Sequence, residues 1–96
     1  MAADDLWLSP AYGRATVALH FTWKPDWRAV RRLLPVLERE LAPFNARPHW
    51  AKLFTHSAAQ LVDVYEHLPD FVAMAHRFDP HGKFRNVFLE TNIFAK

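Results

Sequence analysis

The fold is decided first by one stretch, Ala15-Thr16-Val17-Ala18-Leu19-His20-Phe21-Thr22-Trp23. Apolar and polar side chains alternate along it. That is the period of a β-strand, because successive side chains of a strand point to opposite faces. We therefore expect a strand with one apolar face and one mixed polar face. The shorter stretch Asp5–Ser9, ended by Pro10, is expected to pair with it as a hairpin across a turn at 11–14.

Helical spacing begins after this strand. Asp26 can cap a helix over Trp27–Ala42, in which apolar residues recur at the spacing of a buried helix face. Pro35 inside this helix predicts a kink or a local break, because proline removes one backbone hydrogen bond. Ser57–Gln60 matches a capping box that would open a second helix. We expect Pro69 to close that second helix.

The remaining segments complete the expected architecture. Arg47–Phe54 should be extended, since Pro48 biases the residue before it towards the β region. Asp70 can cap a third helix over Phe71–Phe78, and Asp79-Pro80-His81-Gly82 is a turn signal. Strands and helices interleave without a βαβ glycine turn. We therefore predict an α+β fold, a small antiparallel sheet with packed helices, in a single domain.

Composition limits the classes of function. The chain has 96 residues, of which 51% are hydrophobic and four are tryptophan. A chain of this size buries only about 60–65% of its unfolded surface, so we expect other material to cover part of its apolar surface. Cysteine is absent, which excludes disulfides and thiolate nucleophiles. The acidic start and the lack of a long apolar run predict no secretory signal, no transmembrane segment and a cytoplasmic location.

The net charge, the spacing of the histidines and the scarcity of glycine argue against three kinds of binding site in this chain. The formal charge is +2 and the one basic cluster, Lys24–Arg32, reads as a solvated helix face, so no nucleic-acid partner is expected. The six histidines form no H-E-x-x-H pattern and no pair four residues apart, and we expect no metal site. Glycine occurs only at Gly13 and Gly82, so any dinucleotide would have to be held by another polypeptide segment.

Three polar side chains are candidates for chemistry. His20 and Thr22 share the polar face of the expected strand. That face is either exposed to solvent or forms a pocket wall, where an imidazole could hydrogen-bond a hydroxyl or move a proton. Lys52 lies between aromatic neighbours, Trp50 and Phe54. It either reaches past them to solvent or is held as a cation in a site.

Four strings of the sequence carry a resemblance to a known family. They cover essentially the whole chain, and they resemble the alditol oxidase group. This group belongs with the arabinono-lactone and gulono-lactone oxidases in the vanillyl-alcohol oxidase class of flavoproteins. The strings are Asp4-Asp5-Leu6-Trp7-Leu8-Ser9-Pro10-Ala11-Tyr12, Val17-Ala18-Leu19-His20-Phe21-Thr22-Trp23, Arg47-Pro48-His49-Trp50-Ala51-Lys52 and Phe78-Asp79-Pro80-His81-Gly82-Lys83-Phe84-Arg85-Asn86.

The resemblance implies a two-domain, FAD-dependent oxidoreductase. Residues 1–96 would be the C-terminal part of its substrate (cap) domain together with the C-terminal arm. The FAD-binding domain would be absent from this chain and would be its partner, and the substrate would be a polyol or a sugar lactone. A CH–OH group would give hydride to the flavin, with dioxygen as the final acceptor. Such a chain would be a truncated gene product, a fragment or half of a split enzyme, and it would be inactive alone. The resemblance also leaves open a peripheral association with a membrane, as in some lactone oxidases.

The resemblance also implies roles for individual residues. The pocket lysine of the family falls on Lys52 and its pocket histidine on His20, both as catalytic residues. Thr22 and His49 match substrate-binding positions less closely, and His49 with Lys52 could also contact the cofactor. Lys52 would stabilise negative charge on the substrate oxygen or the reduced flavin, and His20 would hydrogen-bond the polyol or help remove its hydroxyl proton. The competing hypothesis is a non-catalytic α+β module that binds a partner protein through an exposed aromatic face.

Overall fold

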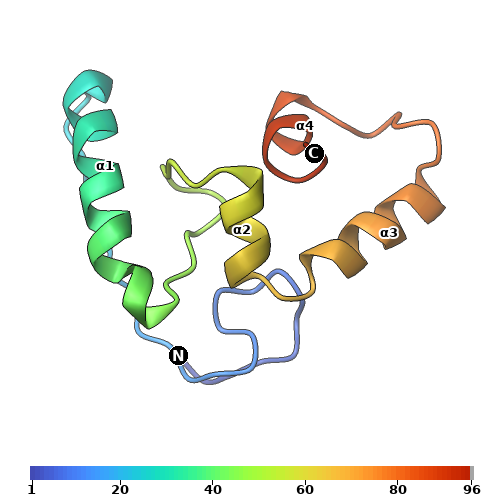
Figure 1. The fold of residues 1–96 in the computed structure, drawn as a ribbon, viewed down its shortest axis with the longest axis horizontal. Helices are drawn as coiled ribbons and strands as arrows, with labels where there is room; N and C mark the ends of the chain where they lie inside the picture. The colour runs from blue at the N-terminus through green and yellow to red at the C-terminus, as the bar shows by residue number, and fades with distance from the viewer. Residues whose placement is uncertain (96) are drawn as a thin grey trace.

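Helices supply the regular structure of residues 1–95, which are the residues that the computed structural model describes (Figure 1). The α-helices α2 and α4 lie side by side at the centre, with α1 and α3 on either side of them (Figure 1). The elements in chain order are α1 (Trp27–Leu41), the short 3-10 helix η1 (Ala42–Phe44), α2 (Ala58–Val64), α3 (Leu68–Phe78) and α4 (Val87–Asn92).

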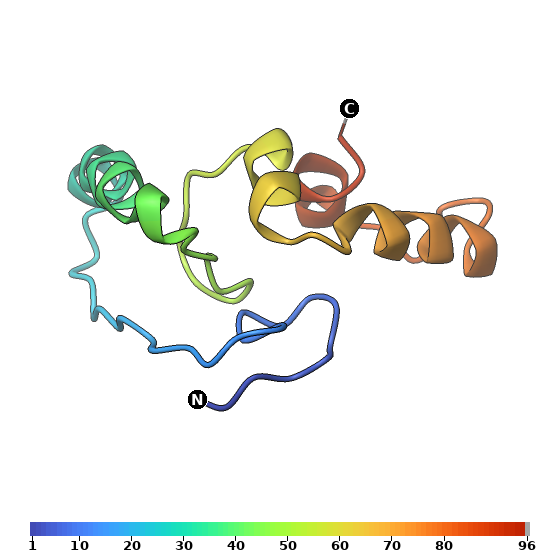
Figure 2. The same ribbon diagram turned by 60° about the horizontal axis from the view of Figure 1, so that its bottom comes forward.

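The predicted α+β fold with a small antiparallel sheet is wrong. Within residues 1–95 the strand pairing consists of a single parallel bridge, between Asp4 and Tyr12. Residues 15–24 are extended but have no partner strand (Figure 2). Alternation fixes how side chains lie on a strand, whereas a stable sheet also needs neighbouring strands, and an isolated two-stranded hairpin is marginal in water.

The expected first strand is instead part of a closed loop. Asp4 closes it through its backbone, because its N–H donates to the carbonyl of Ala11 at 3.1 Å and its carbonyl accepts from Gly13 at 2.9 Å. The hydroxyl of Ser9 donates to the Asp4 carboxylate at 2.5 Å. Within the expected strand, the N–H of Leu6 donates to the Asp4 carboxylate at 3.1 Å and the N–H of Ser9 donates to the carbonyl of Leu6 at 3.0 Å. Local bonds thus occupy backbone groups that a hairpin would have needed, since short polar side chains compete with ladders for backbone partners.

The helix starts confirm two predictions from the sequence. The carboxylate of Asp26 accepts from the N–H of Ala29 at 3.2 Å and so caps α1. Ser57 and Gln60 form the predicted capping box at the start of α2. Of the kink or local break expected at Pro35, the break is wrong, because α1 continues through that residue as one helix.

The C-terminal boundaries differ from the prediction. Pro69 opens α3 rather than closing α2, because proline suits the first turn of a helix, where its missing N–H costs nothing. The helix before it ends at Tyr65, which adopts an extended backbone conformation. The sequence analysis missed α4, although Asn86 caps it by accepting from the N–H of Leu89 at 2.9 Å.

The core is small and lies where α2, α3 and α4 meet. Its buried members are Leu61, Tyr65, Leu68 and Ile93. Apolar side chains from the N-terminal loop and from the segment before α2 pack against it, Leu8, Trp50 and Phe54 among them. The first helix, α1, lies apart from this cluster (Figure 1) and buries only Val30 and Leu34.

The molecule has more surface than a free-standing protein of its mass. Its accessible surface is 7410 Å², whereas a folded monomer of 11.2 kDa has about 5,700 Å². Its radius of gyration is 14.5 Å, against about 12.5 Å for a compact domain of this length. The difference is about 1,700 Å², and the exposed surface includes many large apolar side chains, which are typical of contact surfaces where they gather. No helix within residues 1–95 is both long and apolar enough to span a membrane.

Candidate functional site

The candidate site is centred on a tight turn in the string Arg47–Lys52, which the sequence analysis expected to be extended. The N–H of Lys52 donates to the carbonyl of His49 at 3.0 Å. The ring Nδ1 of His49 accepts from the N–H of Ala51 at 3.1 Å. The string therefore begins extended after its proline and then turns sharply, so that His49 and Lys52 both lie at its exposed tip.

Arg47 anchors the start of this turn. Its Nη1 donates to the carbonyls of Tyr12 at 2.7 Å and Pro10 at 3.1 Å. Its Nε donates to the carbonyl of Val64 at the end of α2, at 2.7 Å. Burial lowers the pKa of Arg47, and the nearby Arg14 cation lowers it further. One planar guanidinium thus joins the N-terminal loop to α2, a use for which its fixed fork of donors is suited.

Two aromatic side chains hold the rest of the turn against the core. The hydroxyl of the buried Tyr65 donates to the carbonyl of Pro48 at 2.6 Å. The indole Nε1 of Trp50 donates to the carbonyl of Leu8 at 2.8 Å, and its ring lies 4.7 Å from that of Tyr65. Burial raises the pKa of Tyr65 to about 12, although the Arg47 cation acts in the opposite direction. The turn is therefore held against the core by two hydrogen bonds and by the packing of the two rings.

The four predicted site residues fall into two exposed pairs. His49 and Lys52 share the turn, whereas His20 and Thr22 lie on the extended segment that leads to α1. Within residues 1–95 no hydrogen bond or ion pair joins one pair to the other. Residues 1–95 include one hollow between α3 and α4 and another between α2 and the C-terminal end of α4, and none of the four residues lines either. Within residues 1–95, His49 thus lies with Lys52 and His20 lies with Thr22, but the two pairs are not joined to each other.

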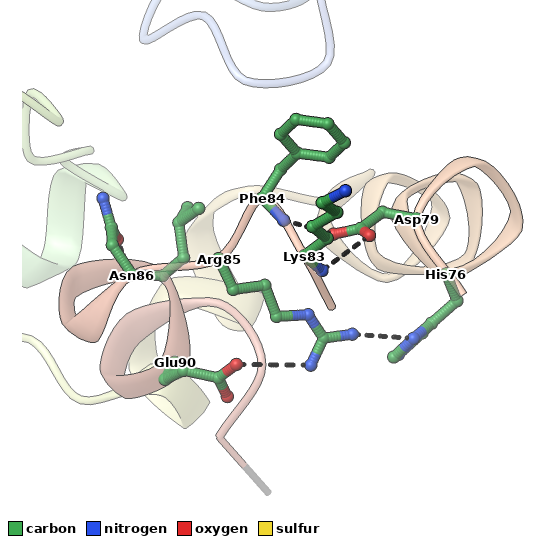
Figure 3. Close-up of polar contacts among 8 residues, drawn as sticks. His76, Asp79, Lys83, Phe84, Arg85, Asn86 and Glu90 are labelled. Atoms are coloured by element: carbon green, nitrogen blue, oxygen red, sulfur yellow. Dashed lines mark hydrogen bonds and ion pairs between the residues drawn. The ribbon is translucent and has the colours of Figure 1, made fainter. Parts of the chain in front are cut away.

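The second motif, at residues 79–86, also forms a built turn (Figure 3). The carboxylate of Asp79 accepts from the backbone N–H groups of Lys83 at 2.8 Å and Phe84 at 3.0 Å. The bond from Phe84 is the main cause of the lowered pKa of Asp79, and the bond from Lys83 adds to it against an opposing desolvation effect. Gly82 takes a left-handed conformation with φ of 66°, which favours glycine.

Arg85 connects this turn to two helices (Figure 3). Its guanidinium lies 3.0 Å from the ring Nδ1 of His76 in α3 and 3.4 Å from the carboxylate of Glu90 in α4. It also lies 3.9 Å from the centre of the Phe94 ring, at cation–π distance. Phe84 points away from this network and is 80% exposed. The motif thus fixes the α3–α4 connection and presents one aromatic ring outward.

Glu38 provides a polar link from α1 to the rest of the chain. Its carboxylate accepts from the N–H and the hydroxyl of Thr55, both at 2.6 Å. The ring Nδ1 of His56 lies 3.3 Å from the same carboxylate, at ion-pair distance but without hydrogen-bond geometry. This link positions α1 beside the segment that precedes α2.

The comparison with known proteins matches the stretch that contains both motifs. Residues 1–92 match the model of the D-arabinono-1,4-lactone oxidase family. The chain belongs to this family. The family resemblance drawn from the sequence is thereby confirmed.

Relatives of this oxidase family are much longer than the chain. An alditol oxidase from a Streptomyces strain is 53% identical over 89 residues, which is 93% of this chain and 21% of the relative. An L-gulono-1,4-lactone dehydrogenase of Mycobacterium tuberculosis is 34% identical over 87 residues, 88% of this chain and 20% of the relative. An L-gulonolactone oxidase of Scyliorhinus torazame is 28% identical over 95 residues, 96% of this chain and 22% of the relative. The chain spans about a fifth of their length.

The residues that support the turn and the α3–α4 connection could not all be identified from the sequence. Arg47 entered the sequence analysis as the residue before Pro48 and as part of the family string 47–52, and Arg85 as part of the family string 78–86, with no structural role for either guanidinium. Each arginine could have predicted its own role, because a guanidinium that lies among apolar residues needs hydrogen-bond acceptors. Tyr65 lies just beyond the end of α2, and its hydroxyl needed a partner, as buried tyrosines do.

Proposed function

We propose that the chain forms part of the substrate-facing portion of an FAD-dependent oxidoreductase. The enzyme would oxidise a CH–OH group of an alditol or an aldonolactone with dioxygen as the acceptor. The observation that carries this proposal is the 53% identity to an alditol oxidase over almost the whole chain. The match to the D-arabinono-1,4-lactone oxidase family model supports it. A cytoplasmic location stays a prediction.

The residues described here do not by themselves fit FAD. A dinucleotide pyrophosphate is held by backbone N–H groups in a glycine-rich turn or at a helix N-terminus. Gly13 and Gly82 are the two glycines of the chain, and they lie in separate turns. The hollow between α3 and α4 is lined mainly by apolar side chains. The FAD would therefore be held by polypeptide outside these 96 residues, and this chain would contribute side chains to the substrate side.

In this proposal the exposed turn presents its cation to the substrate. Lys52 is exposed, and the turn that carries it is fixed through Arg47 and Trp50. A positioned ammonium would stabilise negative charge that develops on the substrate oxygen, and a prearranged cation does so without reorganisation. His49, at the same tip, would contact the substrate chain. His20 would hydrogen-bond a hydroxyl or accept its proton, with Thr22 beside it on the same face.

A chimera tests the proposal. This chain would replace the homologous 89-residue stretch of the Streptomyces alditol oxidase, and anaerobic flavin reduction by xylitol would be followed by absorbance. We expect flavin reduction in the chimera and a fall of about 100-fold or more in Lys52→Ala, which is typical for loss of a charge-stabilising group. His20→Ala should lower the rate as well. Lys24→Ala, at another exposed lysine, is the matched control.

The outcomes separate the proposal from its parts. A folded, flavin-loaded chimera that no alditol or lactone reduces would refute the proposed function. Normal reduction rates in Lys52→Ala would leave the oxidase assignment standing but would refute the role of that lysine. Equal losses in Lys52→Ala and Lys24→Ala would show that general surface charge, rather than a positioned cation, is responsible.

A further inference from the structure

The turn at 47–52 carries Lys52, but the lysine side chain itself has no anchor. Within residues 1–95 no hydrogen bond or ion pair involves its ammonium group. Its backbone N–H donates to the carbonyl of His49 at 3.0 Å, which closes the turn. The region that the ammonium can reach is therefore set by the backbone from which the side chain leaves.

The backbone that enters this turn has one free rotation. The ring of Pro48 fixes its φ angle, and the residue before a proline is restricted as well. The remaining rotation is ψ of Pro48, which swings the peptide plane between Pro48 and His49. The carbonyl oxygen of Pro48 lies in this plane, and the plane is rigid. A partner that fixes this oxygen therefore also fixes the direction in which the chain continues into the turn.

Tyr65 is the partner of this oxygen. Its hydroxyl donates to the carbonyl of Pro48 at 2.6 Å. The residue is 1% exposed, and its backbone N–H donates to the carbonyl of Leu61 in α2 at 2.9 Å. Its ring lies 4.7 Å from the ring of Trp50, and the guanidinium of Arg47 lies 5.8 Å from its centre. A ring that is packed on several sides holds its hydroxyl in one direction.

We propose that Tyr65 is a positioning residue for Lys52, which it places through the carbonyl of Pro48. The link runs from the end of α2 through the Tyr65 hydroxyl to the entry of the turn, and the turn carries the direction on to the lysine. Its catalytic meaning rests on the proposed function, because a charge-stabilising group acts only where the charge develops. The link itself rests on the bond between Tyr65 and Pro48.

The other two anchors of the turn have a broader role. Arg47 joins the N-terminal loop to α2, and Trp50 bonds to Leu8 in the same loop. The loss of either would therefore detach the loop and the turn together. The hydroxyl of Tyr65 bonds to the turn alone within residues 1–95. Tyr65→Phe removes this bond and leaves the ring in the core, so it separates the position of the turn from the packing beneath it.

Flavin reduction in the chimera with the Streptomyces alditol oxidase tests the catalytic effect. We expect Tyr65→Phe to lower the limiting rate at saturating xylitol by about 10-fold, because a displaced group stabilises the transition state less well. The xylitol concentration that gives half of this rate should change by less than about 2-fold, since the lost interaction acts in the transition state. Ile93→Val shortens another buried side chain of the same core. It is the matched control for lost stability and should keep the limiting rate.

A double-mutant cycle separates positioning from a purely structural effect. If Tyr65 acts through Lys52, removal of its hydroxyl has no further effect once the ammonium is gone. We therefore expect Tyr65→Phe to change the rate of the Lys52→Ala chimera by less than about 2-fold. A structural effect lowers the rate by the same factor whether the lysine is present or not. Equal factors in the two backgrounds, or an unchanged rate in Tyr65→Phe alone, would overturn the proposal.

Amide hydrogen exchange in the 96-residue chain gives a readout that does not depend on catalysis. The amide of Lys52 should exchange about 5-fold faster in Tyr65→Phe than in the parent chain, as expected when one hydrogen bond that holds the turn is lost. Ile93→Val should change this rate less. If Tyr65→Phe speeds the exchange no more than Ile93→Val does, the turn keeps its shape without the hydroxyl and the proposal is wrong.

The two proposals fail in different ways. A chimera that reduces flavin equally well with and without the Tyr65 hydroxyl refutes the positioning role and leaves the proposed function intact. A folded, flavin-loaded chimera that no alditol or lactone reduces refutes the proposed function. The exchange of the Lys52 amide then decides alone whether Tyr65 fixes the turn.

Discussion

Replacing Arg47 by lysine should destabilise the chain although it keeps the charge. Arg47 donates from two separate nitrogens, Nη1 to Pro10 and Tyr12 and Nε to Val64. A lysine ammonium presents its donors from a single point and can reach one of these groups of carbonyls but not both. A hydrogen bond to a charged group contributes about 1.5–3 kcal/mol, so the loss of one of them, the bond to Val64, predicts a cost of about 1.5–3 kcal/mol.

Urea unfolding of the chain, followed by tryptophan fluorescence, measures this cost. At a slope of about 1 kcal/mol per molar urea, the midpoint should fall by about 2 M in Arg47→Lys. Arg39→Lys, at an exposed position in α1, is the matched control and should leave the midpoint within a few tenths of a molar. Equal midpoints for the two variants would refute the argument that the planar fork of Arg47 joins the N-terminal loop to α2.

Three further predictions follow from the two turns. The pKa of Tyr65 is raised from 10.0 to about 12 in the folded chain. The free energy of unfolding should therefore be unaffected by this group below pH 10 and should fall between pH 10 and 12. Urea midpoints measured over this pH range should show the fall in the parent chain and not in Tyr65→Phe. The pKa of Asp79 is lowered in the folded chain. Its contribution to the free energy of unfolding should therefore be present above about pH 4 and be lost as the pH falls further. Acid unfolding should show a weaker pH dependence of stability in Asp79→Asn. Gly82→Ala should cost about 1–2 kcal/mol for its left-handed backbone, with a further loss from contact with Arg85 at 3.3 Å. Gly13→Ala, with φ of 70° and open space around its Cβ, is the control, and equal midpoints for the two alanine variants would show that Arg85 yields freely.

The sequence predicts local features of this fold well where the signal is itself local. The caps at Asp26 and Ser57 depend on side chains within three residues of the backbone groups that they satisfy. Each could therefore be predicted without knowledge of the rest of the molecule. The C-terminal Asn86 cap has the same chemistry, and it was missed because no long apolar period follows it to announce a helix.

The lack of a sheet in residues 1–95 could not be predicted, because strand pairing depends on residues that are distant in the sequence. The pattern at 15–23 describes the faces of a strand and says nothing about where its partner lies. For the same reason the candidate site was only partly predictable. His49 and Lys52 come together because they are three residues apart in one turn. His20 and Thr22 lie on a separate segment, and nothing within residues 1–95 decides how that segment meets the turn.

The turn at 47–52 has two kinds of residue. Arg47, Pro48 and Trp50 are half-buried and make the bonds that join it to the rest of the chain, whereas His49 and Lys52 are exposed and take part only in the two local bonds of the tip. Side-chain substitutions at the outward positions should therefore cost little folding free energy. The turn therefore separates the residues that determine its shape from the two that face the surroundings.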